Sequence, residues 1–280
     1  MHIDINGAKL FFDVVGSKLR PEGNTMLECP TMLVLHGGPG FDHSTLRPHF
    51  DRYADAYQVI YIDHRANGRS TGDLATCTLD QWADDIADFC SALGIEKPVV
   101  FGQSFGGMVA MHYAARHPDG PSKVIFSSTA ASFLMDETAK MMAHLGGPRA
   151  ADLAREFFTN PSVEVHEEYA RICLPLYSQT PVDDTDFRSR AISRPEVGVH
   201  FFETEMMTMD MRAEIAAITC PTLVMGGALD PVTPPKCSVE IAEAIGANAQ
   251  LEMFDGCGHG VHRDQPDTAD TKMRAFLNAD

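Results

Sequence analysis

The chemistry of this chain centres on a serine in a Gly-x-Ser-x-Gly pentapeptide at residues 102–106. A short apolar run leads into the pentapeptide, and an apolar-periodic segment, residues 108–117, follows it. This order predicts a strand, a sharp turn and a helix, with the Ser104 hydroxyl exposed at the turn. Gly102 and Gly106 are expected to leave room where a Cβ would clash. A serine in this position can act as the nucleophile of an acyl-transfer reaction.

A serine hydroxyl is a weak nucleophile at neutral pH, so it needs a base, and the base needs an acid to orient it. Downstream of Ser104 the chain supplies Asp230, in Gly-Ala-Leu-Asp-Pro, and His259, in Gly-Cys-Gly-His-Gly. The order Ser, Asp, His is typical of this kind of turn. Asp255 and His262 are the alternatives for the acid and the base. We favour Asp230 and His259 because both follow predicted strand ends and because glycines flank His259.

The tetrahedral intermediate of acyl transfer also needs preorganised N–H donors. We expect one donor to be the backbone N–H of Phe105, the residue after the nucleophile. The second donor is expected from Gly38, in the His-Gly-Gly-Pro-Gly loop at residues 36–40, because this loop directly follows a fully apolar run. His36 itself is predicted to be a structural hydrogen-bonding residue.

These residues need a scaffold whose strands end at one edge of a sheet. Buried strands are predicted at residues 31–35, 57–62, 98–102, 123–127, 222–226 and 250–254, and helices at about 80–93, 108–117, 235–245 and 266–278. Residues 2–6 and 9–15 predict a hairpin through Asn6-Gly7, and residues 16–30 a loop. The alternation of strands and helices predicts a mostly parallel central sheet covered by helices on both faces. Loops at the carboxyl ends of such strands carry the functional site.

The pattern changes between residues 131 and 214, where helical segments are broken by Gly and Pro and no buried strand is predicted. We therefore predict a core formed by residues 1–130 and 215–280, with a helical cap, residues 131–214, inserted after the sixth strand. Met and Phe are frequent in this insertion. They indicate either an adaptable apolar pocket for an acyl group or ordinary packing of the insertion on the core.

Composition limits the classes of partner. The 280 residues carry a formal net charge of −17, with a pI near 5.0, which argues against binding to nucleic acids or anionic membranes. No apolar run approaches the roughly 20 residues of a membrane helix. The 7 cysteines are widely spaced and include no Cys-x-x-Cys, so we expect reduced thiols and a cytoplasmic location. Without a metal-binding or nucleotide-binding motif, neither a metal nor a cofactor is expected.

Together these motifs resemble those of the α/β-hydrolase superfamily over nearly the whole chain outside the insertion. Within it, the chain is most similar to the prolyl aminopeptidase (proline iminopeptidase) group. Residues 36–40 resemble the H-G-G-P-G loop of that group, residues 63–70 its D-Q-R-G-x-G-x-S turn, and residues 102–108 its G-Q-S-W-G-G-M turn. The resemblance implies the α/β-hydrolase fold and a small-molecule or short-peptide substrate.

Peptidases of that group bind the free amine of the substrate with carboxylates of the cap, and the chain departs from this pattern. A carboxylate motif of W-E type has no counterpart here. Glu196, in a loose counterpart of an A-R-x-E-N-H-Y-F-like segment, is the matching candidate, and Glu203 and Glu205 are the substitutes. Phe201 and Met207 are expected to line the same substrate pocket.

The sequence thus predicts a serine hydrolase that cleaves a small ester, amide or N-terminal peptide bond through an acyl-enzyme, as a prolyl aminopeptidase does. The alternative is a carboxylesterase or lactonase without peptidase activity, for example one that opens acyl-homoserine lactones. A third possibility is a protein that uses the fold for binding or for non-hydrolytic chemistry.

Overall fold

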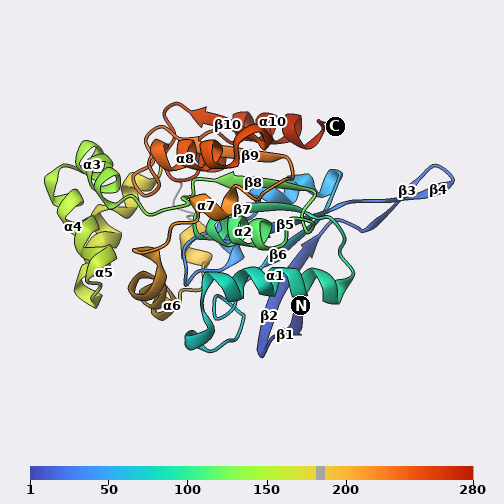
Figure 1. Cartoon of the computed structure of the whole chain (residues 1–280), viewed down its shortest axis with the longest axis horizontal. Coiled ribbons are helices and arrows are strands. Elements are labelled where there is room, and N and C mark those ends of the chain that lie inside the picture. The colour runs from blue at the N-terminus through green and yellow to red at the C-terminus, as the bar shows by residue number, and fades with distance from the viewer. Residues whose placement is uncertain (181–186, 280) are drawn as a thin grey trace.

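The computed structural model describes residues 1–180 and 187–279 (Figure 1). In these residues eight strands form one sheet in the order β1-β2-β6-β5-β7-β8-β9-β10. The strands are β1 (His2–Ile5), β2 (Ala8–Val15), β5 (Thr31–Leu35), β6 (Gln58–Ile62), β7 (Val99–Gln103), β8 (Lys123–Ser127), β9 (Thr222–Gly227) and β10 (Ala249–Phe254). β1 and β2 pair antiparallel, as do β2 and β6. The neighbouring strands β6, β5, β7, β8, β9 and β10, in their order in the sheet, pair parallel. The predicted mostly parallel sheet is confirmed.

Helices cover both faces of this sheet, as predicted. The α-helices of the described residues are α1 (Leu79–Leu93), α2 (Phe105–Arg116), α3 (Met135–Gly146), α4 (Pro148–Thr159), α5 (Val163–Ile172), α6 (Pro195–Phe201), α7 (Arg212–Ile215), α8 (Pro235–Ile245), α9 (Val261–Asp264) and α10 (Pro266–Leu277). Leu33 and Leu35 point into the core formed with α1, α2 and α8. Met32 and Val34 point into a second core formed with α10. Because side chains alternate along a strand, burial of β5 on both faces accounts for its four consecutive apolar residues, 32–35.

Local sequence signals account for the ends of these elements. The hydroxyl of Thr78 accepts a hydrogen bond from the Gln81 amide and caps α1, and Gly94 ends that helix in a left-handed conformation. Asn6 and Gly7 both have positive φ, which is the requirement of the tight turn between β1 and β2. The predicted N-terminal hairpin is therefore present.

The prediction of a loop at residues 16–30 was wrong. Leu19–Glu22 and Thr25–Glu28 form a separate antiparallel hairpin, β3 and β4, which extends away from the main sheet (Figure 1). All eight strand residues are exposed, so the pair has no apolar alternation by which the sequence would reveal it. The remaining signal is Gly23-Asn24 at the turn, a dipeptide that favours two-residue hairpin loops.

Helices α3 to α7 lie between β8 and β9, and α3, α4 and α5 group at one end of the sheet (Figure 1). The division into a core and a cap at residues 131 and 214 remains a prediction. Among the helices of the described residues, none has the length and apolar character that a membrane crossing demands. The seven cysteines, all within the described residues, are buried and form no disulfide.

Candidate active site

Ser104 occupies the sharp turn between β7 and α2. Its backbone has φ 53° and ψ −121°, a strained conformation for a residue with a side chain. The turn is tight enough that a Cβ on Gly102 would collide with the backbone of Gly106, and a Cβ on Gly106 with the carbonyl oxygens of Leu35 and His36. The expected strand–turn–helix is therefore present, and both glycines are sterically required.

The structure brings Ser104, His259 and Asp230 together. The Oγ of Ser104 lies 2.9 Å from Nε2 of His259, and the Nδ1 of His259 lies 3.0 and 2.9 Å from the two carboxylate oxygens of Asp230. Asp230 and His259 follow β9 and β10, whose carboxyl ends lie beside each other in the sheet. A hydroxyl, an imidazole and a carboxylate in this order can transfer the serine proton to the ring and stabilise the imidazolium that forms.

Backbone and side-chain donors hold Asp230 in place. Its fully buried carboxylate accepts hydrogen bonds from the amides of Val232 and Thr233, at 2.9 Å each, and from the Thr233 hydroxyl at 2.8 Å. The Thr233 hydroxyl also lies 3.4 Å from Nδ1 of His259. Sequence reasoning did not single out Thr233, although an Asp that accepts from the residues two and three positions later is a common turn arrangement.

The alternative acid and base lie elsewhere. Asp255 is exposed, and its backbone carbonyl accepts from Gln265. The His262 ring is buried against those of His49 and Phe50, in the core under the opposite face of the sheet. Burial, with the nearby Arg263, holds the pKa of His262 well below its ordinary value. Neither residue has a hydrogen bond to the Ser104 hydroxyl.

The two residues predicted to supply the oxyanion donors, Gly38 and Phe105, line the same cavity as Ser104. Phe105 is the first residue of α2, where N–H groups have no intrahelical acceptor. Gly38 lies in the loop after β5 with φ 64°. A Cβ on the neighbouring Gly37 would lie 3.1 Å from the Ser104 Cβ, so this loop packs directly on the serine.

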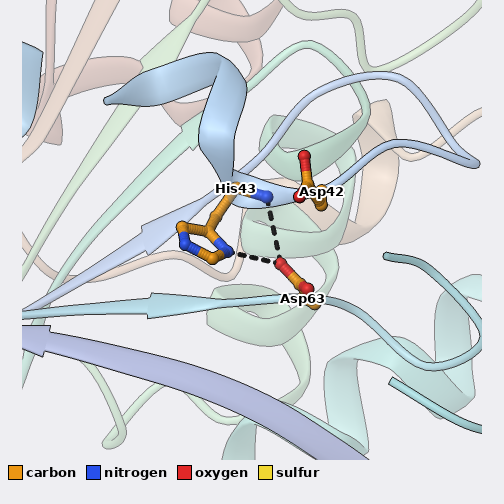
Figure 2. Close-up of side chains that lie close together, drawn as sticks. All are labelled: Asp42, His43 and Asp63. Atoms are coloured by element: carbon orange, nitrogen blue, oxygen red, sulfur yellow. Dashed lines mark hydrogen bonds and ion pairs between the residues drawn. The ribbon is translucent and has the colours of Figure 1, made fainter. Parts of the chain in front are cut away.

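An ion-pair cluster anchors the loop after β5 to the turn after β6 (Figure 2). His43 donates to Asp63 from its backbone amide at 3.0 Å and from Nδ1 at 2.6 Å, and Arg69 lies 2.6 Å from Asp42 and 3.6 Å from Asp63. Burial by itself raises the pKa of Asp63, but the hydrogen bond from His43 and the nearby charges lower it to about 2. The side chains of Asp42, His43 and Asp63 lie close enough together that they could also hold a metal ion. Because Arg69 pairs with both carboxylates and His43 is hydrogen-bonded to Asp63, we assign the cluster to anchoring.

A cavity of about 300 Å³ opens onto Ser104 and His259. Its walls combine the loop after β5 with the segments inserted between β8 and β9, and aromatic rings contribute much of the lining: Phe157, Phe158, Tyr169, Tyr177, Phe201 and Phe202. The ring of Phe157 stacks on Tyr169 at 3.9 Å, and the Tyr169 and Tyr177 hydroxyls are 2.8 Å apart. Such a cavity suits an apolar group of small to medium size.

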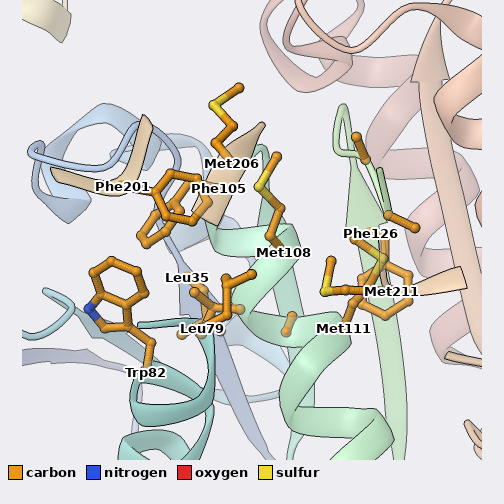
Figure 3. Packing of buried hydrophobic residues seen from close by; sticks show 14 of the residues in the cluster. Leu35, Leu79, Trp82, Phe105, Met108, Met111, Phe126, Phe201, Met206 and Met211 are labelled. Atoms are coloured by element: carbon orange, nitrogen blue, oxygen red, sulfur yellow. The ribbon is translucent and has the colours of Figure 1, made fainter. Parts of the chain in front are cut away.

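Of the four residues predicted to bind substrate, Phe201 lines the cavity. It is buried, and its ring packs edge-on against Phe105, beside Met206 and Met108 (Figure 3). Phe157, Phe158, Phe202 and Met206 from the Met- and Phe-rich insertion also line the cavity.

The other three predicted residues lie outside the cavity lining. Glu196 and Glu203 are exposed, and Met207 is 40 % exposed. Glu205, the further substitute, accepts a hydrogen bond from the Leu79 amide at the start of α1. A wider helical turn at Phe202–Met206, which contains Glu203 and precedes Met207, changes the faces on which these two side chains lie. Glu196 precedes this turn, in the first turn of α6.

A family model for the alpha/beta hydrolase fold matches residues 30–266. The chain belongs to the α/β-hydrolase family. The proline iminopeptidase PfmaB of Pestalotiopsis fici is 27 % identical over 286 residues, which cover 98 % of each chain. The resemblance to this group indicated by the motifs is thus confirmed.

Solved structures share the α/β-hydrolase fold over nearly their whole length. The proline iminopeptidase of Mycobacterium smegmatis gives a TM-score of 0.78 at 22 % identity, covering 99 % of this chain and 97 % of its own. An esterase from Exiguobacterium antarcticum gives 0.76 at 18 % identity, covering 98 % and 97 %. The peptidase and the esterase have almost the same TM-score against this α/β-hydrolase, so similarity of fold does not indicate which kind of substrate this chain uses.

Proposed function

We propose that this α/β-hydrolase is a serine hydrolase that forms an acyl-enzyme and prefers small esters or lactones with an uncharged, apolar acyl group. The observation that carries the proposal is the hydrogen-bonded chain from Ser104 through His259 to Asp230, which opens on an aromatic-lined cavity.

In the acylation step, Nε2 of His259 takes the proton of the Ser104 hydroxyl while Oγ forms a bond to the substrate carbonyl carbon. The carbonyl oxygen becomes an oxyanion, which accepts hydrogen bonds from the amides of Gly38 and Phe105. Asp230 holds the Nδ1–H of His259 and stabilises the imidazolium. When the tetrahedral intermediate collapses, the leaving group takes the proton from Nε2, and the acyl group stays on Oγ.

In the deacylation step, water replaces the leaving group and the same residues act in the same roles. Nε2 of His259 takes a proton from the water as its oxygen attacks the acyl carbon. The second intermediate collapses, the bond to Ser104 Oγ breaks, and the proton returns to Oγ as the free acid leaves.

The preference for an uncharged acyl group rests on the lining of the cavity. No Asp or Glu occurs among the described residues that line it. An ammonium group moved from water into such surroundings lacks a counter-ion, and its desolvation is costly. The phenyl rings of Phe157, Phe158 and Phe202 instead offer apolar surface to an alkyl or aryl acyl group.

An aminopeptidase acting on N-terminal proline is the second candidate. The identity to the P. fici proline iminopeptidase over nearly the whole length of both chains supports it. In this alternative the ammonium group would have to bind outside the apolar lining, and Glu196 is the residue whose sequence position favours it.

A pair of anilides that differ in one group separates the two candidates. We expect cyclopentanecarbonyl p-nitroanilide to exceed prolyl p-nitroanilide in kcat/KM by about tenfold or more, because the charged ring nitrogen is replaced by CH₂ while the leaving group stays the same. p-Nitrophenyl butyrate and an acyl-homoserine lactone, followed by pH-stat, extend the series to esters and lactones. The Ser104→Ala variant supplies the blank rates.

A faster reaction of the prolyl anilide would overturn the preference for uncharged acyl groups and support the aminopeptidase. Glu196→Gln would then be the next variant. Failure of every substrate and of a fluorophosphonate to react would overturn the serine-hydrolase proposal itself.

Thr233→Val is expected to lower kcat for p-nitrophenyl butyrate by roughly 10- to 100-fold, because a hydrogen bond to a charged carboxylate is lost while the shape of the side chain is kept. Thr233 also lines the cavity, but KM should change less than kcat, since valine keeps the shape of the side chain there. Thr233→Ser, which restores the hydroxyl, should recover most of the rate. A valine variant with the parental kcat would show that the two backbone amides hold Asp230 sufficiently.

A further inference from the structure

Asp264, the last residue of α9, is a buried carboxylate that the proposed reaction does not use. It follows His259 by five positions and is 9 % exposed. Its side chain accepts hydrogen bonds from two parts of the chain that are far from each other in sequence. Ser178 (Oγ, 2.5 Å), Gln179 (amide, 3.1 and 3.2 Å) and Thr180 (amide, 3.1 Å) approach from one side, and the Gly258 amide (2.7 Å) from the other.

On the side of the base, the bond from Gly258 fixes the loop that carries His259. Gly258 is the residue directly before His259, and its amide points to Oδ2 of Asp264. The His259 amide then donates to the carbonyl of Tyr177 at 2.7 Å. A Cβ on Gly258 would collide with this same carbonyl, so the loop and the segment 177–180 are in direct contact.

On the side of the substrate, segment 177–180 contributes Tyr177 to the cavity wall. The Tyr177 ring meets the His259 ring edge-on, with centroids 5.2 Å apart. Tyr177 is the last residue of a short 3-10 helix, Leu174–Tyr177, in the part of the chain between β8 and β9, and residues 178–180 follow it. A single carboxylate therefore connects the loop of the base to a wall of the substrate cavity.

We propose that Asp264 is a positioning residue that couples the placement of His259 to the placement of the cavity wall at residues 177–180. This inference rests on the proposed function of His259 as the general base. An ionised carboxylate has two acceptor oxygens and can satisfy all of these donors at once. If segment 177–180 moves away from Asp264, the hydrogen bond from the His259 amide to the Tyr177 carbonyl is also lost. A shift of about 1 Å at a catalytic group can lower the rate about 100-fold.

Asp264→Asn is the decisive variant, because asparagine keeps the size of the side chain but replaces one acceptor oxygen by an NH₂ group that faces N–H donors. We expect kcat for p-nitrophenyl butyrate to fall roughly 10- to 100-fold and the rate of inactivation by diisopropyl fluorophosphate to fall by a similar factor. Asp267→Asn, an exposed position three residues later, should keep both rates.

Ser178→Ala tests the coupling from the other side. It should lower the inactivation rate in the same direction as Asp264→Asn, although by less, because the two amides remain. In the Asp264→Asn background the same change should have little further effect, since the Ser178 hydroxyl acts through Asp264. Thermal unfolding of each variant shows whether it is folded at the assay temperature.

The outcomes separate this inference from the proposed function. A parental enzyme that diisopropyl fluorophosphate does not inactivate contradicts the serine-hydrolase proposal. A parental enzyme that is inactivated, together with a folded Asp264→Asn variant that reacts at the same rate, overturns the role of Asp264 alone. If Asp264→Asn does not fold, an unchanged inactivation rate in Ser178→Ala overturns the coupling, and a lowered rate supports it.

Discussion

Ser104→Ala is expected to remove hydrolysis of p-nitrophenyl butyrate, with kcat reduced by about 10⁶-fold, the order of loss measured when the nucleophile of a serine hydrolase is deleted. Covalent labelling by a fluorophosphonate should disappear as well, because the Oγ that forms the phosphonyl ester is absent. The two measurements are independent, since labelling reports bond formation without turnover.

The fold of this variant should be intact. Within residues 1–180 and 187–279, the Oγ of Ser104 has one hydrogen-bond partner, Nε2 of His259. The backbone carbonyl of Ser104 accepts from the Thr129 hydroxyl and is unaffected. Alanine tolerates the positive φ of the turn no worse than serine does. Ser91→Ala, at an exposed position on α1, is the matched control and should keep both activities. Labelling that persists in Ser104→Ala would assign the nucleophile to another residue.

Gly106→Ala is expected to destabilise the protein by about 3 kcal/mol or more, because the added Cβ has no space to occupy. It would collide with the carbonyl oxygens of Leu35 and His36, at the end of β5. β5 pairs with β6 on one side and β7 on the other, so its backbone cannot move away without breaking the centre of the sheet. Urea denaturation would measure the loss.

Gly23→Ala is the matched control for this prediction. Gly23 has a φ of 58°, and a Cβ there would meet nothing within 4 Å. Its replacement should therefore cost only the conformational strain of about 1 to 2 kcal/mol. Equal losses in the two variants would mean that the contact between the Ser104 turn and β5 has little energetic weight.

Much of the fold, and the approach of Ser104, Asp230 and His259 to one another, were predictable from the sequence. The apolar run 31–35 has the same bounds as β5, and the predicted helix at about 80–93 differs from α1 by one residue at its start. Strands buried on both faces and capped helices leave strong local patterns because burial and capping act on neighbouring residues. Ser104, Asp230 and His259 could be placed near one another because each follows a predicted strand, and parallel strands have their carboxyl ends at the same edge of the sheet.

The contacts that depend on distant residues were not predictable in this way. Glu196, Glu203 and Met207 were expected at the substrate and lie outside the cavity lining. For Glu203 and Met207, the wider helical turn at Phe202–Met206 changes the faces on which they lie. Asp264 gave no local signal, since its partners in segment 178–180 are more than 80 positions away in the chain.

Local sequence thus determined the strands of the main sheet, the helices that pack on it and the positions of Ser104, Asp230 and His259 after strand ends, because these depend on residues within a few positions of one another. The tertiary structure alone decided which aromatic rings line the cavity beside Ser104, that no carboxylate of the described residues joins them, and that the Asp264 carboxylate accepts hydrogen bonds from both Ser178 and Gly258. These features depend on how the segments between β8 and β9 pack over the sheet, and packing between distant segments has no periodicity along the chain from which it could be deduced.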